Sequence, residues 1–155
     1  MSDKKLKIAI IGNGGIARNA HAPAYEKMDN VEIVGACDII EERAKAMAER
    51  FGAKFYTTDY KEIFNIEGLD AVDICTPNYF HSVIAVDALE HGLNVFCEKP
   101  DAINVEEAKK MKAAAEKSGK VLMVMRNNRF MEVSSYVKSF VEEGKMGEVY
   151  TARCG

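Results

Sequence analysis

A glycine-rich turn follows directly after an apolar run near the start of the chain. Gly12, Gly14 and Ala17 have the spacing Gly-x-Gly-x-x-Ala after the run Leu6–Ile11. In a strand–turn–helix unit the first glycine permits the tight turn, the second lets a pyrophosphate approach the backbone, and the third small residue lets helix and strand pack closely. The amides and the positive dipole end of a helix that starts near Gly14 would face the phosphates. The turn alone leaves the ligand open, because such turns also occur without a ligand and methyltransferases use a similar loop.

A carboxylate ends the second apolar run. Val31–Cys37 is followed by Asp38, 21 residues after Ala17, about where a Rossmann unit places the acid that accepts hydrogen bonds from the adenosine ribose. A carboxylate there repels a ribose 2′-phosphate, so NAD is favoured over NADP, although Arg43, one turn into the next helix, weakens that preference. Asp38 also fits an N-cap of a helix beginning near Glu41, and the two roles are compatible.

Polar and titratable residues crowd three further turns that follow predicted strands. These turns read Thr76-Pro77-Asn78-Tyr79-Phe80-His81, Glu98-Lys99-Pro100 and Arg126-Asn127-Asn128-Arg129-Phe130. In an open α/β sheet the ligand lies outside the carboxyl ends of the strands, so these turns and the glycine turn together predict the site. Taken singly, Glu98-Lys99 also fits a solvated surface pair, and His81 an ordinary residue of a first helical turn.

The elements that position these turns alternate along the chain. Strands are predicted at 6–11, 31–38, 54–57, 71–76, 94–97 and 121–125, and helices at 15–28, 41–51, 60–64, 79–90, 104–118 and 132–143. The first helix is expected to carry its apolar face on Ile16, Ala20, Ala24 and Met28. This alternation predicts an α/β fold, a three-layer doubly wound parallel sheet of about six strands with the Rossmann architecture.

Composition limits the class of protein. The 155 residues are 48% apolar and 29% charged, the balance of one globular domain. The net charge of −3, with no basic cluster, gives no indication of nucleic-acid binding. The apolar run 6–11 is too short for a signal sequence or a membrane span, so we expect a cytoplasmic protein without membrane association.

The cysteines predict neither a metal site nor a disulfide framework. Cys37, Cys75, Cys97 and Cys154 are far apart, form no Cys-x-x-Cys pair and have no histidine at ligand spacing. We therefore expect reduced thiols, most of them near the ends of strands.

The last residues suggest a domain boundary. Residues 148–154 are predicted to start a further strand that has no partner in the chain. The sequence therefore predicts a Rossmann domain over 1–145, followed at 146–155 by a segment that looks truncated.

The combined motifs resemble a known family. The glycine turn, Asp38, Thr76-Pro77-Asn78 with His81, and Glu98-Lys99-Pro100 are similar to those of the Gfo/Idh/MocA oxidoreductases, the relatives of glucose–fructose oxidoreductase and inositol dehydrogenase. The resemblance covers essentially the whole chain, and Glu98-Lys99-Pro100 is its most specific element. It implies hydride transfer between NAD or NADP and a hydroxyl carbon of a sugar, polyol or related small molecule. It also implies that 146–155 are the first strand of, or the linker to, an absent C-terminal α/β domain, which forms the substrate pocket, and that the full enzyme is a homo-oligomer.

The resemblance assigns roles to individual residues. It implies that the pyrophosphate is held by Gly12, Asn13, Gly14, Gly15 and Ile16, and the adenosine ribose by Asp38. The inner half of the cofactor would be lined by Thr76, Pro77, Asn78 and His81. Glu98 would lie near the nicotinamide ribose, with Pro100 and Arg129 beside it. Lys99 is the implied catalytic or proton-relay lysine, and a cis Lys99–Pro100 bond would fix its aim. An ammonium there can hydrogen-bond the reacting hydroxyl and stabilise developing alkoxide charge.

The chain departs from the family pattern at several positions. Asp101 stands where an apolar or small residue is usual, and Met125 and Asn128 stand where Gly and Arg are frequent, which affects the substrate side and leaves the cofactor site intact. The family's Asp and His that complete acid–base catalysis belong to the second domain. The chain alone is therefore expected to bind cofactor with little or no turnover.

Two other interpretations stay open at this point. The chain could be a non-catalytic nucleotide-sensing or partner-binding Rossmann module, with its last strand offered as an edge. A methyltransferase-like site is the weaker alternative, against which Glu98-Lys99-Pro100 argues.

Overall fold

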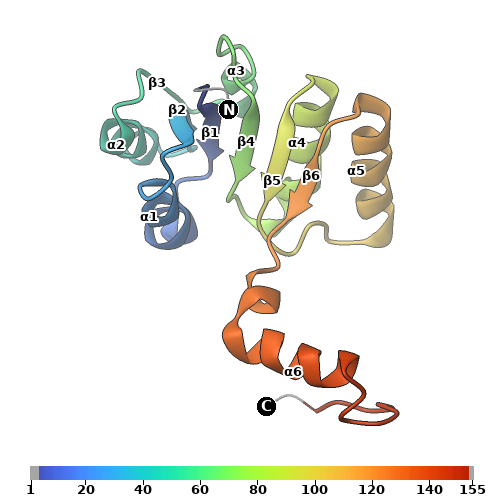
Figure 1. Cartoon of the computed structure of the whole chain (residues 1–155). Helices are drawn as coiled ribbons and strands as arrows, with labels where there is room; N and C mark the ends of the chain where they lie inside the picture. Colours follow the sequence, from blue (N-terminus) through green and yellow to red (C-terminus); the bar gives the residue numbers. More distant parts are fainter. Residues whose placement is uncertain (1–3, 154–155) are drawn as a thin grey trace. The chain divides into compact units, whose positions relative to one another are not determined.

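Six parallel strands form one sheet in the computed structural model, which describes residues 4–153 (Figure 1). The strands are β1 (Leu6–Ile11), β2 (Val31–Cys37), β3 (Phe55–Thr57), β4 (Ala71–Ile74), β5 (Asn94–Cys97) and β6 (Leu122–Val124), in the order β3-β2-β1-β4-β5-β6. The order reverses between β1 and β4, so their carboxyl ends form the switch point at which such sheets bind ligands. The predicted doubly wound Rossmann sheet is confirmed.

The helices fall close to their predicted positions. They are α1 (Ala22–Tyr25), α2 (Glu41–Phe51), α3 (Tyr60–Ile63), α4 (Asn78–Glu90), α5 (Val105–Ser118) and α6 (Glu132–Glu142), with a π-helical turn η1 (Ala17–His21) and a 3-10 turn η2 (Asn127–Phe130). Left-handed Gly52 and Gly119 end α2 and α5. Asn104 caps α5 by accepting the Glu107 N–H at 2.9 Å. Among the described residues, no helix has the length and apolar character needed to span a membrane.

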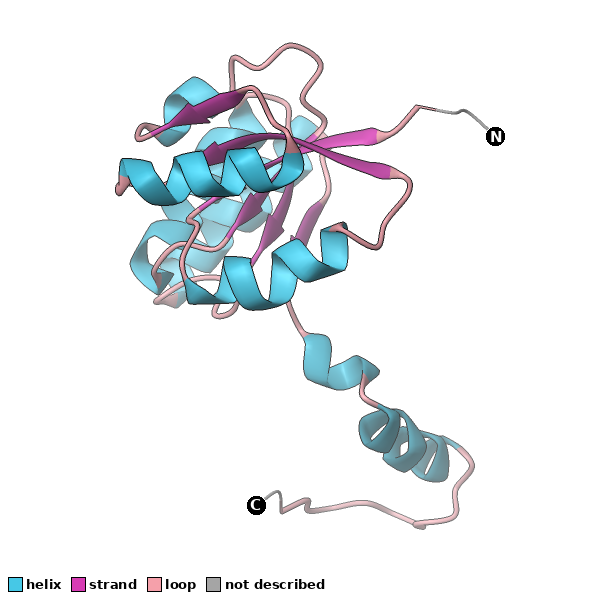
Figure 2. Cartoon of the chain, turned by 90° about the vertical axis from the view of Figure 1, so that its left-hand side faces the viewer, coloured by secondary structure: helices cyan, strands magenta, loops and turns pink. Residues whose placement is uncertain are grey.

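Two hydrophobic cores pack on opposite faces of the sheet, because alternate residues of β1 point to opposite sides. Ile8 and Ile10 pack with residues of η1, α1 and α2, whereas Ala9 and Ile11 pack with residues of α3, α4 and α5. Helices accordingly cover both faces of the sheet (Figure 2). A parallel sheet needs this double cover, since both faces of its strands are apolar.

The first helix contains a π turn and buries a different face from the one predicted. The Ala22 N–H donates to the Ala17 carbonyl, five residues back, and Pro23 has no N–H to continue the α-helical pattern. The expected apolar residues Ile16, Ala20, Ala24 and Met28 are exposed, while Ala17, His21 and Ala22 are buried. That prediction was wrong because the wider turn changes the register of the helix and because one buried position is a histidine.

The chain divides into two compact units, residues 1–125 with the sheet and residues 126–155 with η2 and α6. Residues 148–153 form no strand, so the strand predicted there is wrong over the described residues, and Cys154 lies outside them. The reason is that a strand is stabilised by hydrogen bonds to a neighbour, and no described strand pairs with this segment.

Candidate functional site

The turn after β1 is forced close to the turn after β4. Gly12 has φ +91°, and a Cβ on it would lie 2.7 Å from the Cys75 carbonyl carbon and from the Thr76 nitrogen. Its N–H donates to the Cys37 carbonyl at 2.7 Å. Only glycine satisfies both the backbone angle and the contact. Gly12 therefore lets the turns that follow β1, β2 and β4 meet at the switch point.

Open space lies beside the next two glycines. A Cβ on Gly14 or Gly15 would meet no atom within 4 Å, and the helix begins at Gly15. Packing against the chain therefore does not demand glycine here. A phosphate that approached the backbone at this helix start would use that space.

Asp38 ties the glycine turn to the loop after β2. One carboxylate oxygen accepts the Asn13 N–H at 2.7 Å, and the other accepts the Ile40 N–H at 2.9 Å. Ile40 is the N-cap residue of α2, and its own side chain makes no capping hydrogen bond. Asp38 is thus not the N-cap of α2, and both of its oxygens keep a free lone pair with which to accept a ribose hydroxyl.

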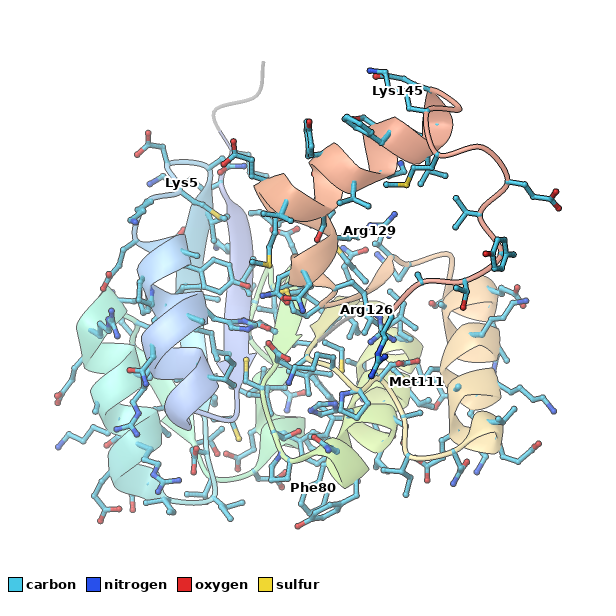
Figure 3. The ribbon with its side chains drawn as sticks, turned by 90° about the horizontal axis from the view of Figure 1, so that it is seen from below. Lys5, Phe80, Met111, Arg126, Arg129 and Lys145 are labelled. Atoms are coloured by element: carbon cyan, nitrogen blue, oxygen red, sulfur yellow. The ribbon has the colours of Figure 1, made fainter. Side chains whose placement is uncertain are left out.

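A cavity of about 440 Å³ opens between these loops. Of the predicted site residues it is lined by Gly12, Gly14, Asp38, Arg43, Thr76 and Pro77. Tyr79 and Phe80 from the start of α4 add aromatic surface, with ring centroids 4.4 Å apart. Phe80 projects away from the ribbon in the view onto the carboxyl ends of the strands (Figure 3). The volume is in the range of small-molecule sites.

Two buried polar atoms at this site lack a partner within the described chain. They are Asn13 Oδ1 and Thr76 Oγ1, in the turns after β1 and β4. Asn13 is fully buried, and its amide nitrogen donates to the Cys37 carbonyl at 2.8 Å. Buried polar atoms are rarely left unpaired. These atoms and the space beside Gly14 and Gly15 fit a polar ligand such as a dinucleotide.

His81 joins the turns after β4 and β5. Its ring nitrogens lie 2.7 Å from the Thr76 carbonyl and 2.6 Å from the Pro100 carbonyl, and the side chain is buried. Carbonyl oxygens only accept, so the ring nitrogen that carries hydrogen donates to the carbonyl that it faces. His81 therefore holds the position of both turns.

The remaining predicted residues occupy varied positions. Ile16, Asn78, Lys99 and Pro100 are exposed, and the Lys99–Pro100 bond is cis. Arg129 belongs to the second unit, where its guanidinium lies 5.6 Å from the Phe130 ring centroid. Figure 3 labels Arg129 together with Arg126 of the same unit.

Comparison with known proteins decides the family. Residues 6–126 match the Gfo/Idh/MocA family, described as an oxidoreductase family with an NAD-binding Rossmann fold. The chain belongs to this family. Membership agrees with Glu98-Lys99-Pro100 in arguing against a methyltransferase-like site.

Several relatives of this Gfo/Idh/MocA domain are sugar or polyol dehydrogenases. The chain is 35% identical to D-glucoside 3-dehydrogenase of Escherichia coli over 100% of its own length and 46% of the relative. It superposes on myo-inositol 2-dehydrogenase of Lactobacillus plantarum with a TM-score of 0.87 at 29% identity, covering 94% of this chain and 43% of the other. The WlbA dehydrogenase of Bordetella pertussis, in complex with NADH and UDP-GlcNAcA, gives 0.90 at 29% identity, with 97% and 43% coverage. The chain thus spans less than half the length of these relatives.

The Gfo/Idh/MocA site also contains a buried network that the sequence analysis missed. His21 Nδ1 lies 2.7 Å from Asp73 Oδ2, and His21 Nε2 lies 3.1 Å from Glu98 Oε1. The Tyr25 hydroxyl donates to the same Asp73 oxygen at 3.0 Å. The side chains of His21, Asp73 and Glu98 are buried, and Tyr25 is half-buried. Asp73 was the available signal, because a carboxylate inside an apolar strand is buried only with a partner.

The network shifts the pKa values of its members. Burial lowers the pKa of His21, but hydrogen bonds and charges from Asp73 and Glu98 outweigh it and raise that pKa above its ordinary value. Burial, followed by the charge of Asp73, raises the pKa of Tyr25 and of Cys75 far above their ordinary values. The raised pKa of His21 widens the pH range in which both of its ring nitrogens carry hydrogen.

The donor types His21, Asp73 and Cys75 would also suit a transition metal, since their ligand atoms lie within 4.8 Å of one another. Each His21 ring nitrogen already faces a carboxylate oxygen, and the Cys75 thiol donates to Asp73 Oδ1 at 3.6 Å. We therefore interpret the cluster as hydrogen-bonded. Cys37 and Cys97 are likewise free, and burial raises the pKa of each to about 12.

Proposed function

We propose that this chain is the NAD(H)-binding domain of a dehydrogenase that acts on a hydroxyl carbon of a sugar, polyol or related small molecule. The observation that carries the proposal is Asp38, which is buried, anchored to the glycine turn at 2.7 Å, and still able to accept hydrogen bonds. The dehydrogenase relatives D-glucoside 3-dehydrogenase and myo-inositol 2-dehydrogenase support the substrate class.

The residues divide the work along the cofactor. Gly14 and Gly15 give the pyrophosphate access to the helix start, with Gly12, Asn13 and Ile16 shaping the turn. Asp38 accepts hydrogen bonds from the adenosine ribose. Bound NAD supplies the carbon that accepts or donates the hydride. The inner half of the site is formed by Thr76, Pro77, Asn78, His81, Glu98 and Pro100.

NAD is preferred over NADP in this proposal. With the adenosine ribose at Asp38, a 2′-phosphate would bring a second anion close to the carboxylate, and the two would repel. Arg43 lines the same cavity from α2 and is exposed, so it attracts a phosphate. The carboxylate dominates because it is buried and fixed by two backbone hydrogen bonds, whereas an exposed guanidinium is screened.

Lys99 is the proposed catalytic or proton-relay residue. Its ammonium would hydrogen-bond the reacting hydroxyl and stabilise the alkoxide as hydride leaves. Residues 1–145 would form the cofactor domain and 146–155 would lead into a further α/β domain, which supplies the rest of the acid–base machinery, the substrate pocket and the contacts of a homo-oligomer. The chain by itself would bind cofactor without turnover.

A calorimetric titration of the chain with NADH and then NADPH tests the proposal. We expect saturable binding of NADH and a dissociation constant for NADPH at least about tenfold larger, which corresponds to ~1.4 kcal/mol of repulsion. Equal affinities would contradict the role of Asp38 in cofactor choice. Absence of NADH binding would contradict the proposal for this chain.

A further inference from the structure

We propose that His21 is a positioning residue for Lys99 and acts through Glu98. The inference rests on the proposed function, in which Glu98 and Lys99 lie at the nicotinamide end of the site. His21 belongs to the helix after the glycine turn, and Glu98 and Lys99 follow β5. The contact therefore joins the phosphate-binding and nicotinamide ends of one cofactor site.

The connection consists of two successive hydrogen bonds. His21 Nε2 lies 3.1 Å from Glu98 Oε1, and the other carboxylate oxygen, Oε2, accepts the backbone N–H of Lys99 at 2.9 Å. The Glu98 N–H donates to the Ile74 carbonyl at 2.9 Å. The Glu98 side chain is thus fixed at both oxygens and its backbone is fixed to β4.

Lys99 depends on this connection more than its neighbours do. Its side chain is exposed, and with the described residues it makes no hydrogen bond or ion pair. The peptide on one side of it is held by Glu98, and the Pro100 carbonyl on the other side lies 2.6 Å from His81. The direction of the Lys99 side chain is therefore set by its backbone. His21 holds the Glu98 carboxylate, and that carboxylate accepts the Lys99 N–H.

The hydrogen bond at His21 Nδ1, on the side of the ring away from Glu98, keeps the ring in its orientation. Asp73 Oδ2 lies 2.7 Å from His21 Nδ1 and accepts the Tyr25 hydroxyl at 3.0 Å, and Asp73 is fully buried. A second carboxylate behind the imidazole favours the form in which both ring nitrogens carry hydrogen, so Nε2 is a donor toward Glu98. Hydrogen bonds to charged groups are the stronger ones.

Two substitutions separate the two contacts of the ring. In His21→Asn the amide nitrogen stands near the position of Nδ1 and keeps the bond to Asp73 while losing Glu98. In His21→Gln it stands near the position of Nε2 and keeps the bond to Glu98. Tyr25→Phe is the matched control, because it removes one hydrogen bond to Asp73 and leaves Glu98 untouched.

Amide hydrogen exchange at Lys99 measures the positioning without any ligand. We expect exchange of the Lys99 N–H to accelerate about tenfold in His21→Asn relative to the Val72 amide of the core, the factor given by one lost hydrogen bond to a charged group. Exchange in His21→Gln and Tyr25→Phe should stay near the wild-type rate. Unchanged exchange in His21→Asn, or equal acceleration in Tyr25→Phe, would overturn the proposal.

A measurement on the wild-type chain covers the case in which His21→Asn does not fold. The ¹⁵N shift of the Lys99 amide should titrate together with the His21 ring, because loss of the ring proton weakens the bond to Glu98. A Lys99 shift that is independent of the His21 titration would overturn the proposal.

Nucleotide binding separates this inference from the proposed function. ADP-ribose lacks the nicotinamide and reports on the glycine turn and Asp38 alone. His21→Asn should raise the dissociation constant for NADH about tenfold while leaving that for ADP-ribose within about twofold. His21→Gln should return the ratio of the two dissociation constants to the wild-type value. Equal losses for the two ligands would contradict positioning of the nicotinamide end. A wild-type chain that binds neither nucleotide contradicts the proposed function, and the exchange result still decides the role of His21.

Discussion

Asp38 serves the fold and the proposed cofactor at once, and each role predicts its own effect. Its two oxygens accept the N–H groups of Asn13 and Ile40. Asp38→Ala leaves both donors without an acceptor and removes the ribose contact. We expect the dissociation constant for NADH to rise at least tenfold, since a hydrogen bond to a charged group contributes ~1.5–3 kcal/mol. Calorimetric titration of the variant measures this change.

Asp70→Ala is the matched control for that change. Asp70 accepts the Lys7 N–H at 3.0 Å at the amino ends of β1 and β4, away from the carboxyl ends where the site lies. Its loss therefore also removes an acceptor for a backbone donor, yet should leave NADH affinity within about twofold of the wild type. Equal weakening in both variants would mean that Asp38 acts through stability alone.

His21 predicts a pH dependence of stability whose sign follows from its raised pKa. A group whose folded-state pKa lies above its unfolded value stabilises the fold fully below the unfolded pKa, about 6.5 for histidine, and this contribution disappears as the pH rises through the folded-state pKa. The titratable groups in contact with the ring are Asp73, Glu98 and Cys75, and the Tyr25 hydroxyl donates to the Asp73 oxygen behind it.

The difference in melting temperature between the wild type and His21→Gln isolates this contribution. We expect the difference to be largest near pH 6 and to shrink as the pH rises above the ordinary histidine range. Thermal unfolding followed by circular dichroism between pH 6 and 9 measures it. A difference that grows with pH would show that the ring is neutral in the folded chain.

Asp38 and Glu98 could be identified from sequence because each directly follows a predicted strand, and the carboxyl ends of parallel strands lie on the same side of the sheet. His21 could not, because its partners Asp73 and Glu98 are 52 and 77 residues away. No local pattern reports a hydrogen bond at that separation. His81 was identified by position, but its contacts with two carbonyls depend on how the two turns meet in space.

At the level of the element, the glycine turn separates the demands of the fold from those of a ligand. Gly12→Ala forces a methyl group to within 2.7 Å of the β4 turn at a backbone angle of φ +91°. We expect a loss of at least ~2 kcal/mol of stability, measured by denaturant unfolding. Wild-type stability in this variant would contradict the close approach of the two turns.

Gly15→Ala is the reciprocal change in the same turn. Its Cβ would meet nothing within 4 Å, and Gly15 is the first helical residue, where alanine is the better helix former. We expect stability equal to or slightly above the wild type, together with an NADH dissociation constant raised about tenfold if the phosphates approach there. Unchanged NADH binding would place the phosphates elsewhere.

The boundaries of most elements followed from local signals, whereas two failures had physical causes. Gly52, Gly119 and Asn104 act locally, through left-handed backbone and a side-chain cap, so α2 and α5 were found within a residue. The π turn at Ala17–His21 depends on how Pro23 and a buried histidine pack. The strand expected from residue 148 needed a partner, which β-propensity alone cannot supply.

At the level of the whole molecule, the two units differ in how they bury apolar residues. Every buried residue of the hydrophobic cores lies between Ile8 and Ala114. In the second unit α6 exposes Val133, Tyr136, Val137 and Val141, which recur at helical spacing. Such a patch on one helix is typical of a surface that another element covers, which agrees with a chain that spans less than half of its relatives.

This division predicts that the chain shortened to end at Met125 keeps the fold of the first unit. Because the cores lie wholly within that unit, the melting temperature should change by no more than about 4 °C, a shift that corresponds to ~1 kcal/mol. The shortened chain should also stay monomeric at concentrations at which the whole chain associates, since the exposed residues of α6 are gone. Thermal unfolding and sedimentation equilibrium measure the two effects.

A whole chain with Val133→Ser and Val137→Ser is the matched control, because it keeps the length and removes apolar area from the same face of α6. It should associate less than the wild-type chain while its melting temperature stays unchanged. If the shortened chain melts far lower and this double variant does not, residues 126–155 contribute to the stability of the first unit through contacts other than the apolar face. If the double variant associates like the wild type, the surface through which copies meet lies outside α6.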